Sequence, residues 1–282
     1  MKKIICILIC LSLASCSNIS AVTNEVLSKI ESPVEQKAEN AESAESAETK
    51  TLAESTGARI LGEPFKISTN ESEEKDEEHT YMTIKSQNIE FNDDVYEKYP
   101  SLKDRISHFN KTIDNDIKDF KNNLKEAKES FKERPEYAIP YEYSNTLSVV
   151  MFNDDVLIIA NNAYYFTGGA HGSTIVTYLN YDLDKQRDVE LKDVITDMDK
   201  FKEALHKKAD EQKEDLFDDY SETIDKDLAD PDKTLTFFIK DGSLVIEFGQ
   251  YDIAPYSSGL IDFEFPYNEY KNMLNSKYFN KS

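Results

Sequence analysis

The most regular pattern of apolar positions in the chain runs from Leu102 to Phe131. Apolar residues recur every three or four positions and polar residues fill the gaps, which is the pattern of a helix with one buried face. Pro100 precedes this stripe and Pro135 follows it, and we expect Ser101 to cap the first turn. The sequence therefore predicts one long amphipathic helix. Its apolar stripe consists of Leu102, Ile106, Phe109, Ile113, Ile117, Phe120, Leu124, Ala127 and Phe131.

Runs rich in β-forming residues predict strands on both sides of this helix. Asn153-Asp154 and Asp241-Gly242 are short polar joints between such runs, and each predicts an antiparallel hairpin. A weaker apolar stripe predicts a second helix over 199–225, and Pro266 is expected to open a short helix near the C-terminus. Hairpins dominate, so the predicted fold is α+β, with antiparallel sheet hairpins packed with one long and one or two shorter helices. The expected strand regions are 79–91, 141–152, 155–167, 173–183, 234–248 and a last strand before Pro266.

Residues 1–16 have the layout of a bacterial lipoprotein signal peptide. Two lysines precede an apolar run that is too short to span a bilayer, and "LASC" resembles the lipobox in which Cys16 is acylated and becomes the first residue. We therefore expect an extracytoplasmic protein that is lipid-anchored through Cys16 to the bacterial cell membrane or outer membrane. An ordinary cleaved secretion signal is the alternative interpretation.

The rest of the chain divides by composition. Residues 17–62 are rich in Ala, Glu and Ser and carry no sustained apolar stripe, which predicts a disordered tether. The acidic segment before residue 79 is interpreted as a solvated loop. The folded part is expected to comprise an N-terminal α+β subdomain over 63–167 and a C-terminal one over 168–282.

Charge and cysteine content narrow the function classes. The formal net charge is −22, and it becomes −24 when Lys2 and Lys3 leave with the signal. Such a chain repels nucleic acid and anionic lipid head groups and attracts basic partners, so we expect no nucleic acid and membrane contact only through the anchor. All three cysteines lie within residues 1–16, which excludes a disulfide or a catalytic thiol in the mature domain.

The stretch "YFTGGAHGST" at 165–174 concentrates glycine in a chain that has eight glycines in total. It lacks the lysine of a phosphate-binding loop. His171 with Ser173 or Ser257 lacks an identifiable third member of a catalytic triad. The interpretation we favour is a turn whose glycines need positive φ, with His171 packing or hydrogen-bonding locally.

The sequence also contains no complete metal-binding motif. Asp182, Asp184 and Asp188 have alternating spacing like that of a calcium loop, but Arg187 stands where that loop needs glycine. The four histidines show no pair at zinc-ligand spacing. We therefore predict no catalytic residue, no metal and no cofactor.

A second unusual stretch is "GQYDIAPYSSG" at 249–259. Its glycines, proline and tyrosines predict an irregular loop between two strands. Tyr251 and Tyr256 either cover the core or form a recognition surface, because tyrosine offers a large contact area at low entropic cost. Both interpretations stay open.

Taken together, "YYFTGGAHGSTIVTYLNYDL", "VELKDVI" and "TFFIKDGSLVIEFGQYDIAPYSSG" followed by "FEFPYNEY" resemble a bacterial extracytoplasmic domain family of unknown function. This family is found in lysozyme-sensing, RsiV-like anti-sigma factors and in the non-catalytic N-terminal part of certain peptidoglycan deacetylases. The resemblance implies a non-catalytic binding module at the cell envelope, with host lysozyme, a basic protein, or peptidoglycan glycan as the candidate ligand. The residues implied as ligand contacts, together with Tyr251 from the loop analysis, are Gly168, Gly169, His171, Tyr251, Pro255, Tyr256 and Ser257.

Two other functions stay open on the sequence alone. One is an enzyme that modifies peptidoglycan or another polysaccharide with a pair of carboxylates. The chain contains 55 acidic residues, so a candidate pair can always be proposed and carries little weight. The other is a structural surface lipoprotein with a different ligand.

Overall fold

The structure is a computed structural model that describes residues 63–230 and 235–279, and Ile60–Ser282 form one compact unit. The predicted signal peptide, the lipidation of Cys16 and the predicted tether all lie outside the described residues. Among the described helices, none combines the length and the apolar character needed to cross a bilayer.

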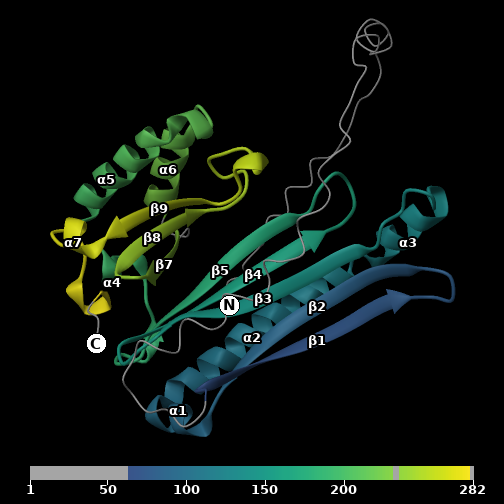
Figure 1. The fold of residues 1–282 in the computed structure, drawn as a ribbon, viewed down its shortest axis with the longest axis horizontal. Helices are drawn as coiled ribbons and strands as arrows, with labels where there is room; N and C mark the ends of the chain where they lie inside the picture. The colour runs from purple at the N-terminus through teal and green to yellow at the C-terminus, as the bar shows by residue number, and fades with distance from the viewer. Residues whose placement is uncertain (1–62, 231–234, 280–282) are drawn as a thin grey trace, which may run out of the picture. The chain divides into compact units, whose positions relative to one another are not determined.

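The first layer is a six-stranded sheet with the order β1-β2-β3-β4-β5-β6 (Figure 1). Neighbouring strands are antiparallel except β2 and β3, which pair in parallel over four residues. This parallel pair was not predicted, and it follows from the helical crossover that separates the two strands in sequence. The strands are β1 (Phe65–Lys75), β2 (Thr80–Phe91), β3 (Tyr141–Phe152), β4 (Val156–Phe166), β5 (Ser173–Asp182) and β6 (Arg187–Asp188).

The crossover contains α1 (Asp93–Lys98), α2 (Pro100–Lys121) and α3 (Leu124–Glu133). The predicted stripe is confirmed along α2, where its apolar side chains are buried against the sheet. Ser101 as the helix cap is wrong, because the helix begins one residue earlier with Pro100 in the first turn and Tyr99 as the cap. Proline suits that position since it has no amide hydrogen to satisfy. The predicted single helix is also broken at Asn122 and Asn123.

The acidic segment predicted as a loop is instead largely the edge strand β1. It pairs with β2 from Phe65 to Lys75, and its charged side chains are exposed except that of Glu74, which is half-buried. Lys121 of α2 forms an ion pair with Glu74 at 2.9 Å. Charged residues on an exposed edge discourage pairing with other chains, so they occur in edge strands although they weaken the strand signal in a sequence.

A three-stranded antiparallel sheet, β7-β8-β9, and the remaining helices make up the second lobe. The predicted turn between β7 and β8 is confirmed, with positive φ at Asp241 (52°) and Gly242 (79°). The predicted helix over 199–225 is two helices separated by a short 3₁₀ turn. The elements are α4 (Leu191–Val194), α5 (Met198–Glu211), α6 (Tyr220–Ala229), β7 (Thr236–Lys240), β8 (Ser243–Phe248), β9 (Ile261–Pro266), α7 (Tyr267–Tyr270) and 3₁₀ turns at Lys213–Asp215, Tyr256–Ser258 and Ser276–Tyr278.

These elements confirm the α+β fold class and place one core on each face of the large sheet. Odd-numbered side chains of β4, such as Leu157 and Ile159, pack in the core beneath α2. Even-numbered ones, such as Val156 and Ile158, pack in the core of the second lobe. The proposed division at residue 167 falls at the turn between β4 and β5, and these two strands pair over ten positions.

The two lobes are joined along β5 by polar contacts that all come from even-numbered residues. The amide of Thr174 donates to Gln250 Oε1 at 2.9 Å, and the hydroxyl of Tyr178 donates to Glu247 at 2.9 Å. Asn180 Nδ2 donates to the carbonyl oxygen of Phe237 at 2.8 Å, and Asp182 accepts from Lys277 and Tyr278. We call these four residues, Thr174, Tyr178, Asn180 and Asp182, the β5 seam.

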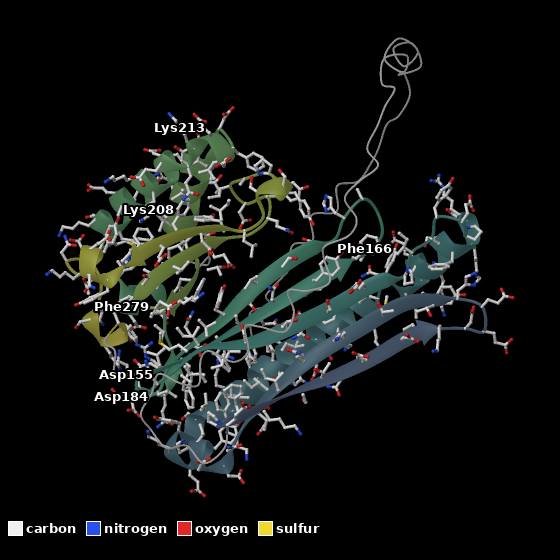
Figure 2. The ribbon with its side chains drawn as sticks, viewed as in Figure 1. Asp155, Phe166, Asp184, Lys208, Lys213 and Phe279 are labelled. Carbon is white, nitrogen blue, oxygen red and sulfur yellow. The ribbon has the colours of Figure 1, made fainter. Side chains whose placement is uncertain are left out.

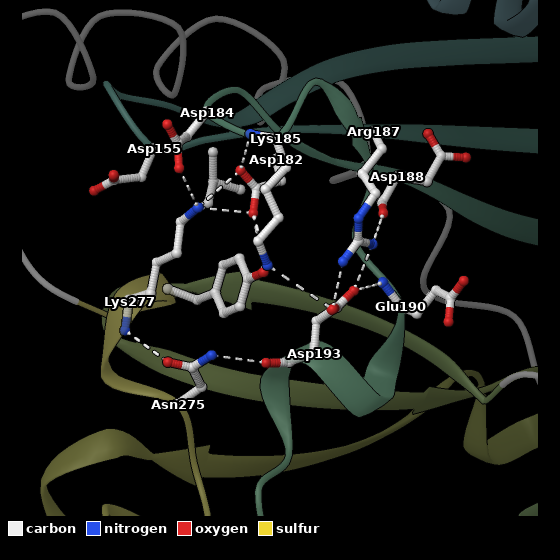
Figure 3. Close-up of polar contacts among 12 residues, drawn as sticks. Asp155, Asp182, Asp184, Lys185, Arg187, Asp188, Glu190, Asp193, Asn275 and Lys277 are labelled. Atoms are coloured by element: carbon white, nitrogen blue, oxygen red, sulfur yellow. Dashed lines mark hydrogen bonds and ion pairs between the residues drawn. The ribbon is translucent and has the colours of Figure 1, made fainter.

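The end of the seam is a buried ion pair (Figure 3). Asp182 is fully buried, and Lys277 Nζ donates to both of its carboxylate oxygens at 2.9 Å. Burial by itself would raise the pKa of Asp182, but hydrogen bonds from the amide of Lys185, from Lys277 and from Tyr278 outweigh it, so the pKa lies below its ordinary value. Nearby, Arg187 holds Asp193 through two contacts of 2.6 and 2.8 Å. Asp182 is therefore a structural acid, and its oxygens are committed to the protein.

Asp182→Asn should lower the free energy of unfolding of Ile60–Ser282 by about 2 to 3 kcal/mol, because it removes the buried charged partner of Lys277 and leaves only the exposed Asp184. Since the pKa of Asp182 is lowered by folding, the wild-type contribution is present above the ordinary carboxyl pKa and is lost as the pH falls through the folded value. Urea denaturation at pH 7 and pH 3 measures both effects. Asp184→Asn is the control, because Asp184 also contacts Lys277 but is 76% exposed, and we expect a change below about 0.5 kcal/mol. Equal losses in the two variants would contradict the assignment.

Candidate functional site

The structure brings together the two loops that the sequence singled out. One loop joins β4 to β5 and contains Gly168–Gly172, and the other joins β8 to β9 and spans 249–260. The bond from the Thr174 amide to Gln250 Oε1 ties the start of β5 to the second loop. Figure 2 places Phe166, the last residue of β4, far along the sheet from Asp155 and Asp184, which lie near the buried ion pair. The loops therefore meet at the end of the seam opposite Asp182.

Glycines give the first loop its shape. Gly168 and Gly169 have φ of +89° and +92°, a region that side chains other than glycine rarely adopt. The predicted turn is confirmed, since β4 and β5 on either side of it are antiparallel. Glycine is needed at position 172 for a different reason, which is lack of space: a Cβ at this position would lie 2.3 Å from the ring of Tyr164. Tyr164 therefore packs directly against the backbone next to His171.

Three aromatic side chains, His171, Tyr251 and Tyr256, form what we call the aromatic cluster. The rings of His171 and Tyr256 are stacked, with centroids 3.8 Å apart and planes 20° apart. The centroids of Tyr251 and Tyr256 are 5.8 Å apart. His171 Nδ1 lies 3.0 Å from the carbonyl oxygen of Gly172, which can only accept, so Nδ1 carries the proton and Nε2 faces the Tyr251 hydroxyl at 3.5 Å.

Tyr251 projects from a strained backbone. It has φ of +68° and is 57% exposed, which rules out the interpretation that its ring covers the core. A non-glycine residue in this region costs on the order of 1 kcal/mol, and such outliers concentrate at functional sites. Buried Ile253 and Ala254 anchor the loop, while Pro255 and Ser257 are exposed beside Tyr256. Of the predicted contact residues, the structure thus brings His171, Tyr251 and Tyr256 together, and the role of the whole set as ligand contacts stays a prediction.

Each of the two loops lies in a region that matches a known family profile. Residues 93–174 match the family profile described as Deacetylase PdaC, and residues 191–268 match the profile described as Protein of unknown function (DUF3298). The chain joins a PdaC-type domain to a DUF3298 domain. The resemblance recognised from the sequence is thus confirmed, and the aromatic cluster takes His171 from the first domain and both tyrosines from the second.

Solved structures share the fold. A member of the DUF3298 family from Bacteroides fragilis is 17% identical, with a TM-score of 0.54 over 76% of this chain and 94% of that chain. A DUF3298 family protein from Pseudomonas aeruginosa is 18% identical, with a TM-score of 0.52 over 78% of this chain and 99% of that chain. At these identities the likeness establishes the fold alone. Among curated proteins, no match to the chain was found.

The catalytic alternatives for His171 have no support in the geometry. Its two ring nitrogens face the Gly172 carbonyl and the Tyr251 hydroxyl, so neither Ser173 nor Ser257 is engaged. Within residues 63–230 and 235–279, no group of three histidine, cysteine or carboxylate side chains is arranged to hold a metal ion.

The DUF3298 domain contains a serine, histidine and aspartate contact that the sequence did not reveal. His206 Nε2 lies 2.7 Å from Asp225 Oδ1, and Ser221 Oγ lies 3.3 Å from His206 Nδ1. Ser221 and Asp225 are exposed on α6, and Lys202 also binds Asp225 at 2.9 Å. The pKa of Asp225 is held below its ordinary value by Lys202 first and His206 second. This contact ties α5 to α6 at the surface. Its only sequence signal was the four-residue spacing of Ser221 and Asp225.

A pair of carboxyl groups does lie in the second lobe, where β8 contacts β5. Glu247 of β8 and Asp262 of β9 are opposite one another in the sheet, and Glu247 is 7% exposed. Burial raises the pKa of Glu247 to about 7, the hydroxyl of Tyr178 opposes that rise, and Asp262 adds to it. Tyr178 also stacks on Phe238 at 4.4 Å, which closes the site from the side of β5. Glu247 is therefore buried in the seam, whereas Asp262 is exposed, and the raised pKa of Glu247 makes the joint sensitive to pH.

Glu247→Gln should remove this pH sensitivity. The folded pKa is raised from 4.5 to about 7, so the unfolding free energy of the wild type falls as the pH rises through that window, by at most roughly 3 kcal/mol. Glutamine keeps an acceptor for Tyr178 and cannot ionise. Between pH 4 and pH 8, the free energy of unfolding of the variant should therefore rise relative to that of the wild type. Denaturation at several pH values measures the difference. Glu264→Gln, an exposed glutamate on the neighbouring strand, is the control. If Glu247→Gln follows the wild-type pH profile, the assignment is wrong.

Proposed function

We propose that the chain is a non-catalytic binding module of the bacterial cell envelope whose ligand contacts the aromatic cluster. The observation that carries this proposal is the cluster itself. Two separate domains contribute stacked, solvent-accessible rings, and the backbone of Tyr251 is held in a strained conformation that keeps its ring outward. Rigid aromatic side chains surrounded by anchored loops are the usual centres of binding energy in protein interfaces.

The ligand class that we favour is a basic protein of the lysozyme type. The net charge of −22 raises the association rate of a basic partner through long-range attraction. Pro255 and Ser257, exposed beside Tyr256, extend the contact surface. A lipid at Cys16 would display this surface outside the cytoplasm, which is where such a partner is met.

Peptidoglycan glycan is the second candidate, because exposed ring faces also suit sugar rings. The alternative of a polysaccharide-modifying enzyme is less well supported by the geometry. Glu247 is 7% exposed and hydrogen-bonded to Tyr178, so this carboxyl does not reach a substrate in the described conformation. A purely structural role for the lipoprotein gives no reason for the positive φ of the exposed Tyr251.

Tyr256→Ala should weaken binding of a basic lysozyme by about 30-fold or more, since loss of a central aromatic contact costs about 2 kcal/mol. Isothermal titration of Ile60–Ser282 with egg-white lysozyme measures this change. Binding by the wild type should also weaken when the salt concentration rises, because the attraction is electrostatic. Tyr137→Ala is the matched control, because Tyr137 is a tyrosine 76% exposed in the α3–β3 connection.

Two outcomes would contradict the proposal that the ligand is a lysozyme. One is an absence of binding at low salt, and the other is an equal effect of Tyr256→Ala and Tyr137→Ala. Titration of soluble peptidoglycan fragments in parallel separates the two candidate ligands. If fragments bind in a Tyr256-dependent manner and lysozyme does not, the second candidate replaces the first.

A further inference from the structure

A pocket that is open to solvent lies on the helix side of the large sheet, where the start of α2 meets the turn between β5 and β6. Its volume is about 500 Å³, which is enough for a small molecule. Residues 181–190 supply one side of its lining, and they fall largely between the two regions that match family profiles. We call it the α2–β6 pocket. The side chains that give it its chemistry are Asp104, Arg105, Tyr181, Gln186, Asp188 and Glu190.

Tyr181 brings an unsatisfied hydroxyl to this pocket. The residue is 2% exposed, and its hydroxyl makes no hydrogen bond within residues 63–230 and 235–279. Burial raises the pKa of Tyr181, the charge of Asp188 adds to the rise, and Arg105 opposes it, so the hydroxyl lies within electrostatic range of both groups. Buried polar groups are nearly always hydrogen-bonded, and leaving one unpaired is costly. Its place in the lining of a pocket therefore points to a ligand atom as the missing partner.

Arg105 offers further free donors. Its Nε donates to Asp188 Oδ1 at 2.6 Å, whereas its two Nη groups make no hydrogen bond to a residue that the structure describes. The side chain is 26% exposed, so the guanidinium is held in place by its surroundings. Arg187, the other arginine of the pocket, is turned toward Asp193 and committed to it by two bonds (Figure 3). A fixed guanidinium with free N–H groups suits a carboxylate.

The turn between β5 and β6 directs Gln186 to the same place. Its φ is +50°, a region that residues other than glycine rarely adopt. Gln186 Oε1 accepts from the backbone amide of Ser101 at 3.0 Å. Because the oxygen is used in this way, Nε2 keeps two donors, and they contact none of the described residues. Three neighbouring side chains of the pocket thus hold unpaired donors.

Carboxylates line the pocket as well. Asp104, Asp188 and Glu190 are three acids against two arginines, so the lining carries one more negative than positive charge. Asp104 is exposed and forms no ion pair with any residue in the described part of the chain. A ligand with only negative charge would be repelled by this excess of carboxylates, and one with only positive charge would leave the donors unpaired. The lining therefore suits a small molecule that carries one charged group of each sign.

We propose that the α2–β6 pocket binds a small zwitterion, namely an amino acid or a short peptide with free termini. The ligand carboxylate accepts from the Nη groups of Arg105, from Nε2 of Gln186 and from the hydroxyl of Tyr181. Its ammonium group pairs with Asp104. This site goes beyond the proposed function, because it lies at the Asp182 end of β5 and the aromatic cluster lies at the other end.

The test uses Ile60–Ser282, with trialanine as the probe in an NMR titration. We expect the amide signals of residues 181–190 and of the first two turns of α2 to shift. Tyr181→Phe should weaken the affinity about tenfold, because it removes one hydrogen bond to a charged group. It should not lower the urea midpoint, since the hydroxyl has no partner among the described residues. Tyr143→Phe is the matched control, because that hydroxyl is also buried and unpaired but belongs to a separate apolar cluster.

Arg105→Lys tests the carboxylate contact. Lysine keeps the positive charge but loses the planar pair of N–H groups, so the affinity for trialanine should fall about tenfold. Arg134→Lys, at an exposed arginine after α3, is the control and should bind like the wild type. Wild-type affinity in Arg105→Lys would contradict the assigned contact.

Two derivatives of the probe test its two charges. Trialanine amide lacks the carboxylate and N-acetyl-trialanine lacks the ammonium group, and each should bind at least about tenfold more weakly than trialanine. Undiminished binding of the amide would indicate a cation site, and undiminished binding of the acetylated form a plain carboxylate site. Either result would overturn the zwitterion. L-alanine, titrated in parallel, shows whether a free amino acid or a peptide is the better source of the same two charges.

Three other results would overturn the inference. They are a spectrum that trialanine leaves unchanged, shifts confined to the loops of the aromatic cluster, and equal affinities of Tyr181→Phe and Tyr143→Phe. Two cross-tests separate this site from the proposed function. Tyr256→Ala should bind trialanine like the wild type, and Tyr181→Phe should bind lysozyme like the wild type, so the two sites succeed or fail independently.

Discussion

The β5 seam is the constraint on which the arrangement of the two domains depends. Four even-numbered residues of a single strand make polar contacts with the second lobe, from Thr174 at one end to Asp182 at the other. Such contacts are directional, and a shift of one residue in β5 would turn the side chains of Tyr178, Asn180 and Asp182 to the helix side of the sheet. The buried apolar side chains on the other face of β5 oppose the same shift, and the row of hydrogen bonds adds to their effect. The seam therefore fixes the register between the PdaC-type and DUF3298 domains.

The aromatic cluster is a consequence of that register. His171 precedes β5 by two residues, and Gln250 follows β8 by two, so the bond between the Thr174 amide and Gln250 brings the two loops to the same place. The stacking of His171 on Tyr256 then needs no long flexible connection. Because β5 itself is held by the buried Asp182 and Lys277 pair at its far end, the position of the cluster is set by contacts along the whole strand. A site built in this way loses little entropy when it binds a ligand.

The sequence predicted those features whose signal is local. The three-and-four spacing identified the buried stripe of α2, Asp241-Gly242 identified its hairpin, and the paired glycines identified the turn before β5. It missed β1, because a charged edge strand buries little and shows hardly any alternation. It also missed the parallel pairing of β2 with β3, since the helices between them hide the crossover.

In the candidate site, too, local features could be predicted from the sequence and tertiary contacts could not. His171, Tyr251 and Tyr256 were singled out individually, but 80 residues separate His171 from Tyr251, and only the tertiary structure shows that their rings meet. Nothing near Glu247 in the sequence predicted a pKa of about 7, because the burial that raises it and the Tyr178 hydroxyl that opposes the rise depend on residues distant in the sequence.

In the binding that we propose, net charge and shape act over two different distances. The net charge acts over about a Debye length, near 10 Å, and favours the approach of any basic partner without selecting among them. Selection then requires short-range contacts, and the rings of the aromatic cluster would supply these without adding to the negative charge. A cluster made of carboxylates would attract a basic ligand more strongly but would pay a larger desolvation cost at the point of contact. Neutral aromatic rings at the centre of the proposed contact surface keep the long-range attraction of the acidic chain and avoid most of that cost.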